Sequence, residues 1–124
     1  MTVQEAITKT NKPSDISDES LVAWLSNLDG QIYAETISWH EDTDDVAHGP
    51  YSTAEMEDVL LVPEPYAEDV YVQYLKARIN HELSETAKYN NCMIVHRAAL
   101  DAFSAYYNRN HMPKQSNYIK GCTL

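Results

Sequence analysis

The stretch from Pro63 to Pro113 decides the fold of this chain, and it reads PEPYAEDVYVQYLKARINHELSETAKYNNCMIVHRAALDAFSAYYNRNHMP. Proline is tolerated in the first turn of a helix, and acidic residues favour the positive end of the helix dipole. Pro63 and Pro65 are followed by Glu68 and Asp69, so this opening predicts the start of a helix near residue 67. Pro113 marks the end of the helical pattern.

Two apolar repeats within this stretch have the spacing of an α-helix. Steps of three and four residues place each set on one face, which a helix buries against its neighbours. The first set is Val72, Leu75, Ile79 and Leu83, and the second is Cys92, Val95, Ala99, Ala102 and Tyr106. Asn90 and Asn91 separate the two sets, and asparagine tolerates the left-handed conformation that ends helices. We therefore expect helices over 67–89 and 92–108, with one unbroken helix over 67–108 as the alternative.

A third helix is predicted upstream, over residues 18–38. Ser17 or Asp18 can cap its first backbone N–H groups. Its apolar face is formed by Leu21, Leu25, Leu28 and Ile32. Gly30 lies inside this pattern, where glycine costs roughly 1 kcal/mol relative to alanine. We expect the helix to bend at Gly30 or another backbone to come close to it.

The segments outside these helices lack a sustained apolar period. Residues 1–14 are expected to form a flexible N-terminal arm, in which Val3, Ala6 and Ile7 would form one helical turn on meeting a partner. Residues 114–124 are expected to form a flexible C-terminal tail. The sequence thus predicts an all-α protein, a small bundle of three main helices in one helical domain over 15–113.

A long acidic connector is expected over residues 40–65. It begins with Glu41, Asp42, Asp44 and Asp45, a run that lacks the alternating ligands, central glycine and closing glutamate of a calcium loop. This run is therefore interpreted as a solvent-facing loop. Val59–Val62 is short and apolar, and no other good strand is available to pair with it. We expect it to be a buried extended segment, or an edge donated to a neighbouring subunit.

The charge of the chain is unevenly distributed. Residues 1–65 hold 14 Asp/Glu and 2 Lys/Arg, whereas residues 66–124 hold 5 and 7, within a total net charge of −10. An acidic first half argues against sequence-specific reading of nucleic acid, which needs cationic contacts to phosphates. It fits a solvated surface, or a protein past which a polyanion moves without sticking.

Length and hydropathy restrict the class of protein further. A chain of 124 residues is long enough for one modest core. It has no apolar run of membrane-spanning length and no basic and apolar leader at its N-terminus, so we expect it to fold in the cytoplasm.

The sequence contains no recognisable catalytic, cofactor or metal motif. His81-Glu82 lacks the second histidine that a zinc protease carries four residues after the first, since position 85 is Glu. The other histidines are scattered, and the glycine content rules out a phosphate-binding loop. Cys92 and Cys122 are expected to be free thiols. We therefore expect a protein that is not an enzyme and that binds no cofactor or metal.

Tyrosine is the most unusual component, with nine copies in the chain. Its apolar ring and polar tip suit cores and protein interfaces equally, and the pattern does not choose between them. Stacking of single-stranded nucleic acid would need more interleaved basic residues.

Several of these segments together resemble a family of small structural proteins of tailed phages and prophages, similar to head–tail connector (adaptor, head-completion) proteins. The segments are Leu60–Tyr66, Tyr74-Leu75, Tyr89–Asn91 and Tyr106–Pro113, with Trp24-Leu25 and Ile32-Tyr33 in the first helix. The resemblance covers roughly residues 18–113.

The resemblance implies a virion protein of the neck, made in the host cytoplasm. Such a protein would form a ring between portal and tail, contact the portal and other neck or tail proteins, and let DNA pass through its lumen without sequence-specific binding. No membrane is involved. The candidate partner-binding residues are Tyr106, Tyr107, Arg109 and His111, together with Tyr118, Ile119 and Leu124 in the tail assigned to portal contact.

A second class of function fits the same residues. A soluble acidic binding module, such as a regulator or inhibitor that mimics nucleic acid, would also carry many carboxylates. It should present them as an ordered patch on rigid elements, whereas most of them here fall in an expected loop. An enzyme with an unrecognised site is the third alternative.

Overall fold

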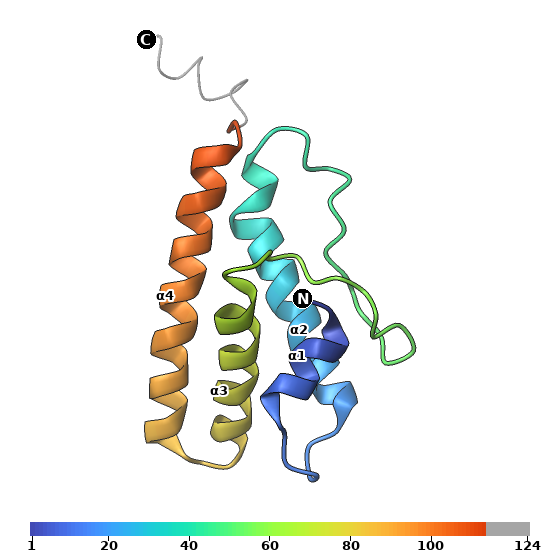
Figure 1. Cartoon of the computed structure of the whole chain (residues 1–124), viewed down its shortest axis with the longest axis vertical. Coiled ribbons are helices and arrows are strands. Elements are labelled where there is room, and N and C mark those ends of the chain that lie inside the picture. The colour runs from blue at the N-terminus through green and yellow to red at the C-terminus, as the bar shows by residue number, and fades with distance from the viewer. Residues whose placement is uncertain (114–124) are drawn as a thin grey trace.

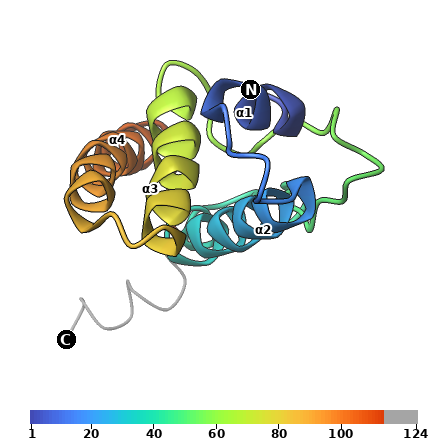
Figure 2. The same ribbon diagram turned by 90° about the horizontal axis from the view of Figure 1, so that it is seen from below.

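The stretch over 63–113 folds into a helical hairpin in the computed structural model, which describes residues 1–113 (Figure 1). π-helix η2 (Glu68–Val72) continues directly into α3 (Gln73–Glu82), and α4 (Thr86–Asn110) returns alongside it. The apolar spacing predicted two helices here, and two helices form. Their inner faces meet along the length of α3 (Figure 2).

The break between the two helices lies earlier than expected. The prediction of a break at Asn90-Asn91 is wrong, because α4 begins at Thr86 and both asparagines lie exposed inside it. Ser84 takes the left-handed conformation instead, with φ +60°. The amides of Leu83 and Ser84 donate to Ile79 and His81 carbonyls and close the turn. Packing along both helices outweighs the weak preference of asparagine for a helix end.

Helix α2 (Asp18–Glu35) confirms the predicted start of the first helix. The Ser17 hydroxyl caps it by accepting the Ser20 amide at 3.2 Å. The helix ends three residues before the expected Ser38, and a 3-10 turn, η1 (Ile37–Trp39), follows. Of the two alternatives for Gly30, the close approach of another backbone is wrong, since a Cβ built there meets nothing within 4 Å.

The N-terminal segment is the main difference from the expected bundle of three main helices. Helix α1 (Val3–Thr10) forms in the segment expected to be a flexible arm, so the described chain has four α-helices. Thr2 and Glu5 form a reciprocal capping box at its start. Val3 and Ala6 are fully buried, which explains why the helix forms without an external partner. The expected flexible tail, residues 114–124, lies outside the described residues.

The connector wraps around the side of the molecule that carries α1 and α2 (Figure 1). Leu60 and Val62 are buried, as expected for an extended apolar segment, while Val59 is exposed. Val59 pairs with Thr2 in an isolated antiparallel bridge, and no strand forms in residues 1–113. The N-terminus therefore supplies the partner that the sequence did not reveal.

One apolar core joins all four helices, and α3 lies at its centre (Figure 2). Its fully buried members include Leu21 and Leu25 from α2, Tyr71 from η2 and Leu75 from α3. On the rim of this core the Arg78 guanidinium lies 5.0 Å from the centre of the Trp24 ring, a cation–π contact between α3 and α2. No helix within the described residues is both long and apolar enough to span a membrane.

The two glycines with known surroundings provide a matched stability test. Gly30→Ala should raise the free energy of unfolding by roughly 0.5–1 kcal/mol, because alanine favours the helix and there is room for its methyl group. Gly49→Ala should lower it by roughly 1 kcal/mol, because Gly49 has φ +96°. Urea unfolding followed by circular dichroism measures both. Destabilisation by Gly30→Ala would contradict the open environment described for this position.

Candidate functional site: a buried carboxylate and the end of helix α4

Asp29 is a fully buried acid, and its carboxylate is the first group in the described chain to consider for a chemical role. The Tyr51 hydroxyl donates to its Oδ2 at 2.5 Å and the Leu61 amide donates to the same oxygen at 3.1 Å. The Tyr71 hydroxyl donates to Oδ1 at 2.6 Å and accepts the Val62 amide at 2.7 Å. Every partner comes from a different segment than α2, so one carboxylate joins helix, connector and η2. We call Asp29, Tyr51 and Tyr71 the Asp29 cluster.

Burial has the largest effect on the pKa values of the Asp29 cluster. It raises the pKa of Asp29 above 3.8, although the hydrogen bonds from Tyr51, Tyr71 and Leu61 act in the opposite direction. Burial and the neighbouring carboxylate also raise the pKa values of Tyr51 and Tyr71 far above 10, so both hydroxyls remain donors at neutral pH.

The geometry of the Asp29 cluster is that of a structural anchor. Both carboxylate oxygens already accept from the protein, and both tyrosines act as donors to it. Asp29 lines none of the five surface depressions identified on residues 1–113. A general base needs free access to a substrate proton, and Asp29 has none.

His96 is a second buried polar group with a structural contact. Its Nδ1 donates to the Val70 carbonyl at 2.8 Å, which ties α4 to π-helix η2. Burial lowers the pKa of His96 below 6.5, so the ring is neutral at pH 7. Within residues 1–113 no three His, Cys, Asp or Glu side chains gather as metal ligands, and Cys92 is a free thiol.

An aromatic cluster lies at the carboxyl end of α4, and the sequence analysis identified only some of its residues. The Tyr107 ring stacks on the His111 ring with centroids 3.7 Å apart, and the His40 ring meets Tyr107 edge-on at 4.7 Å. The backbone holds this arrangement, because the Glu41 amide donates to the Met112 carbonyl at 2.8 Å. We call this region, formed by Trp39, His40, Tyr107, His111 and Met112, the α4-end surface.

The α4-end surface combines exposed apolar groups with an unsatisfied polar atom. Trp39 is 66% exposed and Met112 is 58% exposed. His40 is buried, yet its Nδ1 has no hydrogen-bond partner among residues 1–113. It lines an open depression of about 440 Å³ between η1 and α4. The other lining residues are Glu35, Thr36, Trp39, Ser104, Asn108 and Pro113. Exposed tryptophan and methionine beside a polar pocket are typical of protein-binding surfaces.

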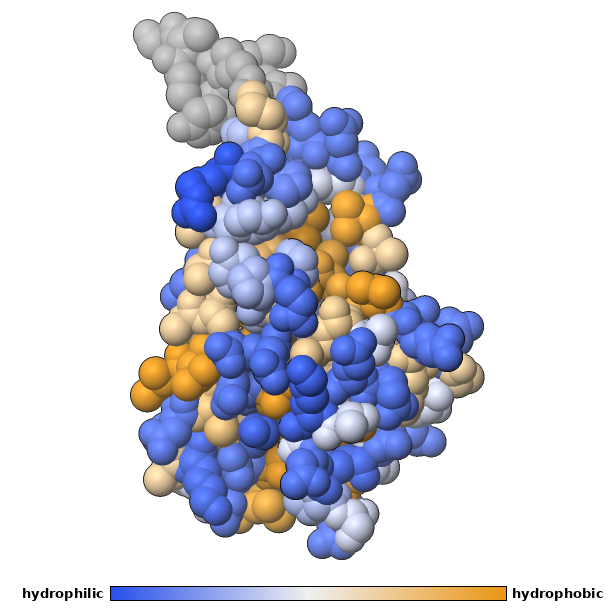
Figure 3. Space-filling model, in the orientation of Figure 1, coloured by the Kyte–Doolittle hydropathy of each residue, from blue (hydrophilic) through white to orange (hydrophobic). Residues whose placement is uncertain are grey.

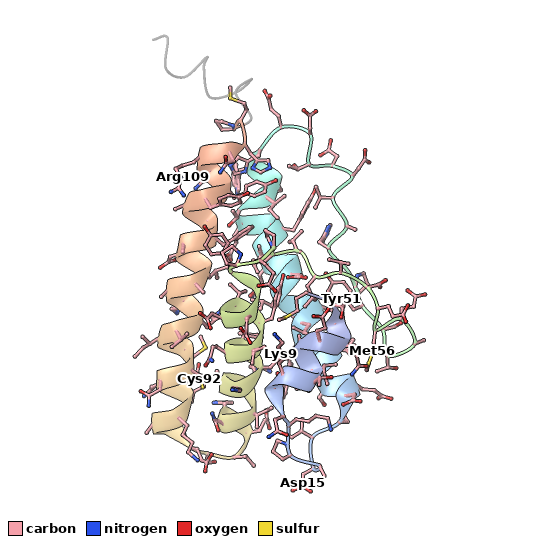
Figure 4. All side chains as sticks on the ribbon, in the orientation of Figure 1. Lys9, Asp15, Tyr51, Met56, Cys92 and Arg109 are labelled. Atoms are coloured by element: carbon pink, nitrogen blue, oxygen red, sulfur yellow. The ribbon has the colours of Figure 1, made fainter. Side chains whose placement is uncertain are left out.

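The predicted partner-binding residues separate into three groups in the structure. Tyr107 and His111 belong to the α4-end surface, and Arg109 projects from the same end of the helix (Figure 4). Tyr107 is itself buried, only 8% exposed, while Tyr106 is partly buried and packs on Tyr66, with ring centroids 5.6 Å apart. Tyr118, Ile119 and Leu124 lie outside the described residues.

Sequence reasoning missed Trp39 and His40 as site residues. Both lie beyond the predicted helix over 18–38. In the structure α2 ends at Glu35, and the 3-10 turn Ile37–Trp39 leaves Trp39 66% exposed. Their only signal was position, since both directly precede the acidic run that begins at Glu41.

Comparison of the chain with protein-family models, curated proteins and solved structures finds no match. The resemblance to phage connector proteins therefore depends on the quoted segments alone.

Asp29→Ala tests the anchor directly. Two hydroxyls and one backbone amide would lose their acceptor, so the free energy of unfolding should fall by about 2–4 kcal/mol. Chemical denaturation measures it, with the exposed α2 residue Asn27→Ala as control. If Asp29→Ala lowered the free energy of unfolding less than Asn27→Ala does, the Asp29 cluster would not be what holds the connector in place.

The raised pKa of Asp29 also predicts a pH dependence with a definite sign. The folded state binds the proton more tightly than the unfolded state, so the contribution of Asp29 is greatest below pH 3.8 and is lost as pH rises through the folded pKa. Asp29→Asn removes this titration. The stability of the wild type relative to Asp29→Asn should therefore fall as the pH is raised above 3.8, measured by denaturation at a series of pH values. If the stability of the wild type relative to Asp29→Asn rose with pH instead, hydrogen bonding would outweigh burial in setting the pKa of Asp29.

Proposed function

We propose that this protein is a structural component of a phage virion, a head–tail connector that forms a ring between portal and tail. One observation carries the proposal: the segments that resemble connector proteins lie together in the fold. Tyr66, from the Pro-Glu-Pro-Tyr segment, packs on Phe103 and Tyr106 in α4. The segment Asn108–Pro113 then pairs with residues 40 and 41 and frames the α4-end surface.

The α4-end surface supplies the contact that a connector needs. Trp39 and Met112 offer apolar area for a partner, and the polar depression beside them offers hydrogen-bonding groups. The described chain ends at Pro113 on this surface, and residues 114–124, assigned to portal contact, follow it in sequence. We propose that the portal or a neighbouring neck protein binds here.

The acidic connector suits passage of DNA. Glu41, Asp42, Asp44 and Asp45 are all exposed at its start. A surface of carboxylates repels a phosphate backbone and so lets DNA move without binding. In the proposed ring these residues would face the lumen.

A soluble acidic regulator that mimics nucleic acid is the second candidate, and one observation favours it. The connector is anchored, since the Tyr33 hydroxyl donates to the Thr43 carbonyl at 3.0 Å and Tyr51 binds Asp29. Its carboxylates therefore lie on a segment held at several points, as a mimic of a phosphate backbone requires.

The copy number of the chain in purified particles separates the two candidates. A connector should be present at one ring's worth per particle, counted against the major capsid protein by quantitative mass spectrometry. Absence from clean particles would overturn the connector proposal and leave the regulator. Hundreds of copies would instead indicate a decoration or tail-tube protein.

Trp39→Ala tests the proposed contact within the particle. The side chain is 66% exposed, so the melting temperature should stay nearly unchanged while the copy number per particle and the yield of tailed particles fall severalfold. Val59→Ala, which alters a 69% exposed residue on the connector, should leave both readings at the wild-type level. Equal effects of the two substitutions would exclude a specific role for the α4-end surface.

A further inference from the structure

The outward face of α4 is an apolar helix surface that no described element covers. Helix α4 packs on α3 and η2 with one side, and its other side lies at the edge of the molecule (Figures 1 and 2). Ile94 is 68% exposed and Val95 is 40% exposed on that side. An apolar area is visible over α4 in the space-filling view (Figure 3). Isolated exposed apolar residues are ordinary, but a contiguous apolar helix face marks an interaction site.

The residues beside Ile94 have the spacing of a socket that receives a side chain from a neighbouring helix, and we call them the Ala98–Ala105 socket. Ala98, Asp101, Ala102 and Ala105 are exposed and follow the spacing i, i+3, i+4 and i+7. In packed helix pairs, four residues with this spacing surround each inserted side chain. Alanine at three of the four positions leaves room for close approach. One helix face thus carries both an exposed side chain that can insert into a neighbouring helix, Ile94, and a socket that can receive such a side chain.

We propose that the outward face of α4 binds the same face of a second copy of this chain, with the two helices antiparallel. A two-fold axis level with Ala98 places Ile94 of each copy level with Ala102 of the other, over the Ala98–Ala105 socket. Such a pairing is self-complementary, as a two-fold interface must be. In an antiparallel pair the two helix dipoles also point in opposite directions, which is electrostatically favourable.

The charges on this face select the antiparallel arrangement. Arg97 and Asp101 lie on the same flank of the face, one turn apart, and neither forms an ion pair with a described residue. The same axis places Arg97 of each copy beside the second copy's Asp101, which gives two equivalent ion pairs. In a parallel two-fold pair this flank of each copy would lie beside the opposite flank of the other, so Arg97 and Asp101 of the two copies would not meet.

This inference does not depend on the proposed function, because it concerns the free chain and uses a different surface from the α4 end. A single helix pair buries less than the roughly 1,200–2,000 Å² of a standard interface, so we expect a dissociation constant in the micromolar range.

Sedimentation of the full chain across a concentration series tests the dimer. The wild type should change from monomer to dimer between about 1 and 500 µM. Ala98→Glu should remove the dimer over this range, since it fills the socket and places a charge at its centre. Ala23→Glu makes the same substitution at an exposed site of α2 and should sediment as the wild type does. A wild type that stays monomeric, or an oligomer that Ala98→Glu leaves intact, would overturn the proposal.

A charge exchange then tests the orientation. Arg97→Asp should weaken dimerisation roughly tenfold, because two ion pairs become two repulsive contacts. Adding Asp101→Arg should restore the affinity to within about threefold of the wild type, because the pairs are re-formed with exchanged signs. Circular dichroism of each variant monitors the helix itself. A double variant as weak as the single one would exclude the antiparallel pairing.

Discussion

The hydrogen bonds to the buried carboxylate of Asp29 are the interaction on which the arrangement of this protein depends. A buried charge is costly unless its lone pairs are satisfied. Here α2 supplies the carboxylate, while Tyr51 and Leu61 from the connector and Tyr71 from η2 supply donors. These segments are distant in sequence and have little regular structure between them. The need to satisfy one buried acid therefore fixes where the long connector runs.

The anchored connector in turn gives the molecule two chemically different sides. The connector side carries the exposed carboxylates that begin at Glu41, and the opposite side carries the apolar outward face of α4 (Figure 1). Between them, at the carboxyl end of α4, Trp39 and Met112 are exposed beside the buried His40 ring. The two proposals are built on these three surfaces: the acidic side, the apolar helix face and the aromatic end.

Only those residues of the candidate site that belong to a recognisable sequence segment could be predicted. Tyr107 and His111 were identified because they fall in the segment that resembles connector proteins, and the structure brings them together. Tyr106 belongs to the same segment but lies on another side of α4, where it is partly buried on Tyr66, whereas Tyr107 is the more buried of the two. Trp39 and His40 could not be predicted, because their placement depends on where α2 ends and on a backbone pairing with residues 112 and 113.

The sequence by itself determined three of the four described helices, because apolar spacing and capping act between near neighbours. Ser17 starts α2 as predicted, and two helices form within 63–113. Only the tertiary structure decided that residues 3–10 are a fourth helix, that the hairpin turns at Ser84, and that Asp29 lies among three donors. Each of these features depends on burial against residues far along the chain. In the sequence these contacts leave at most a short mark, such as the single helical turn of Val3, Ala6 and Ile7, and their energies exceed the local preferences that a sequence displays.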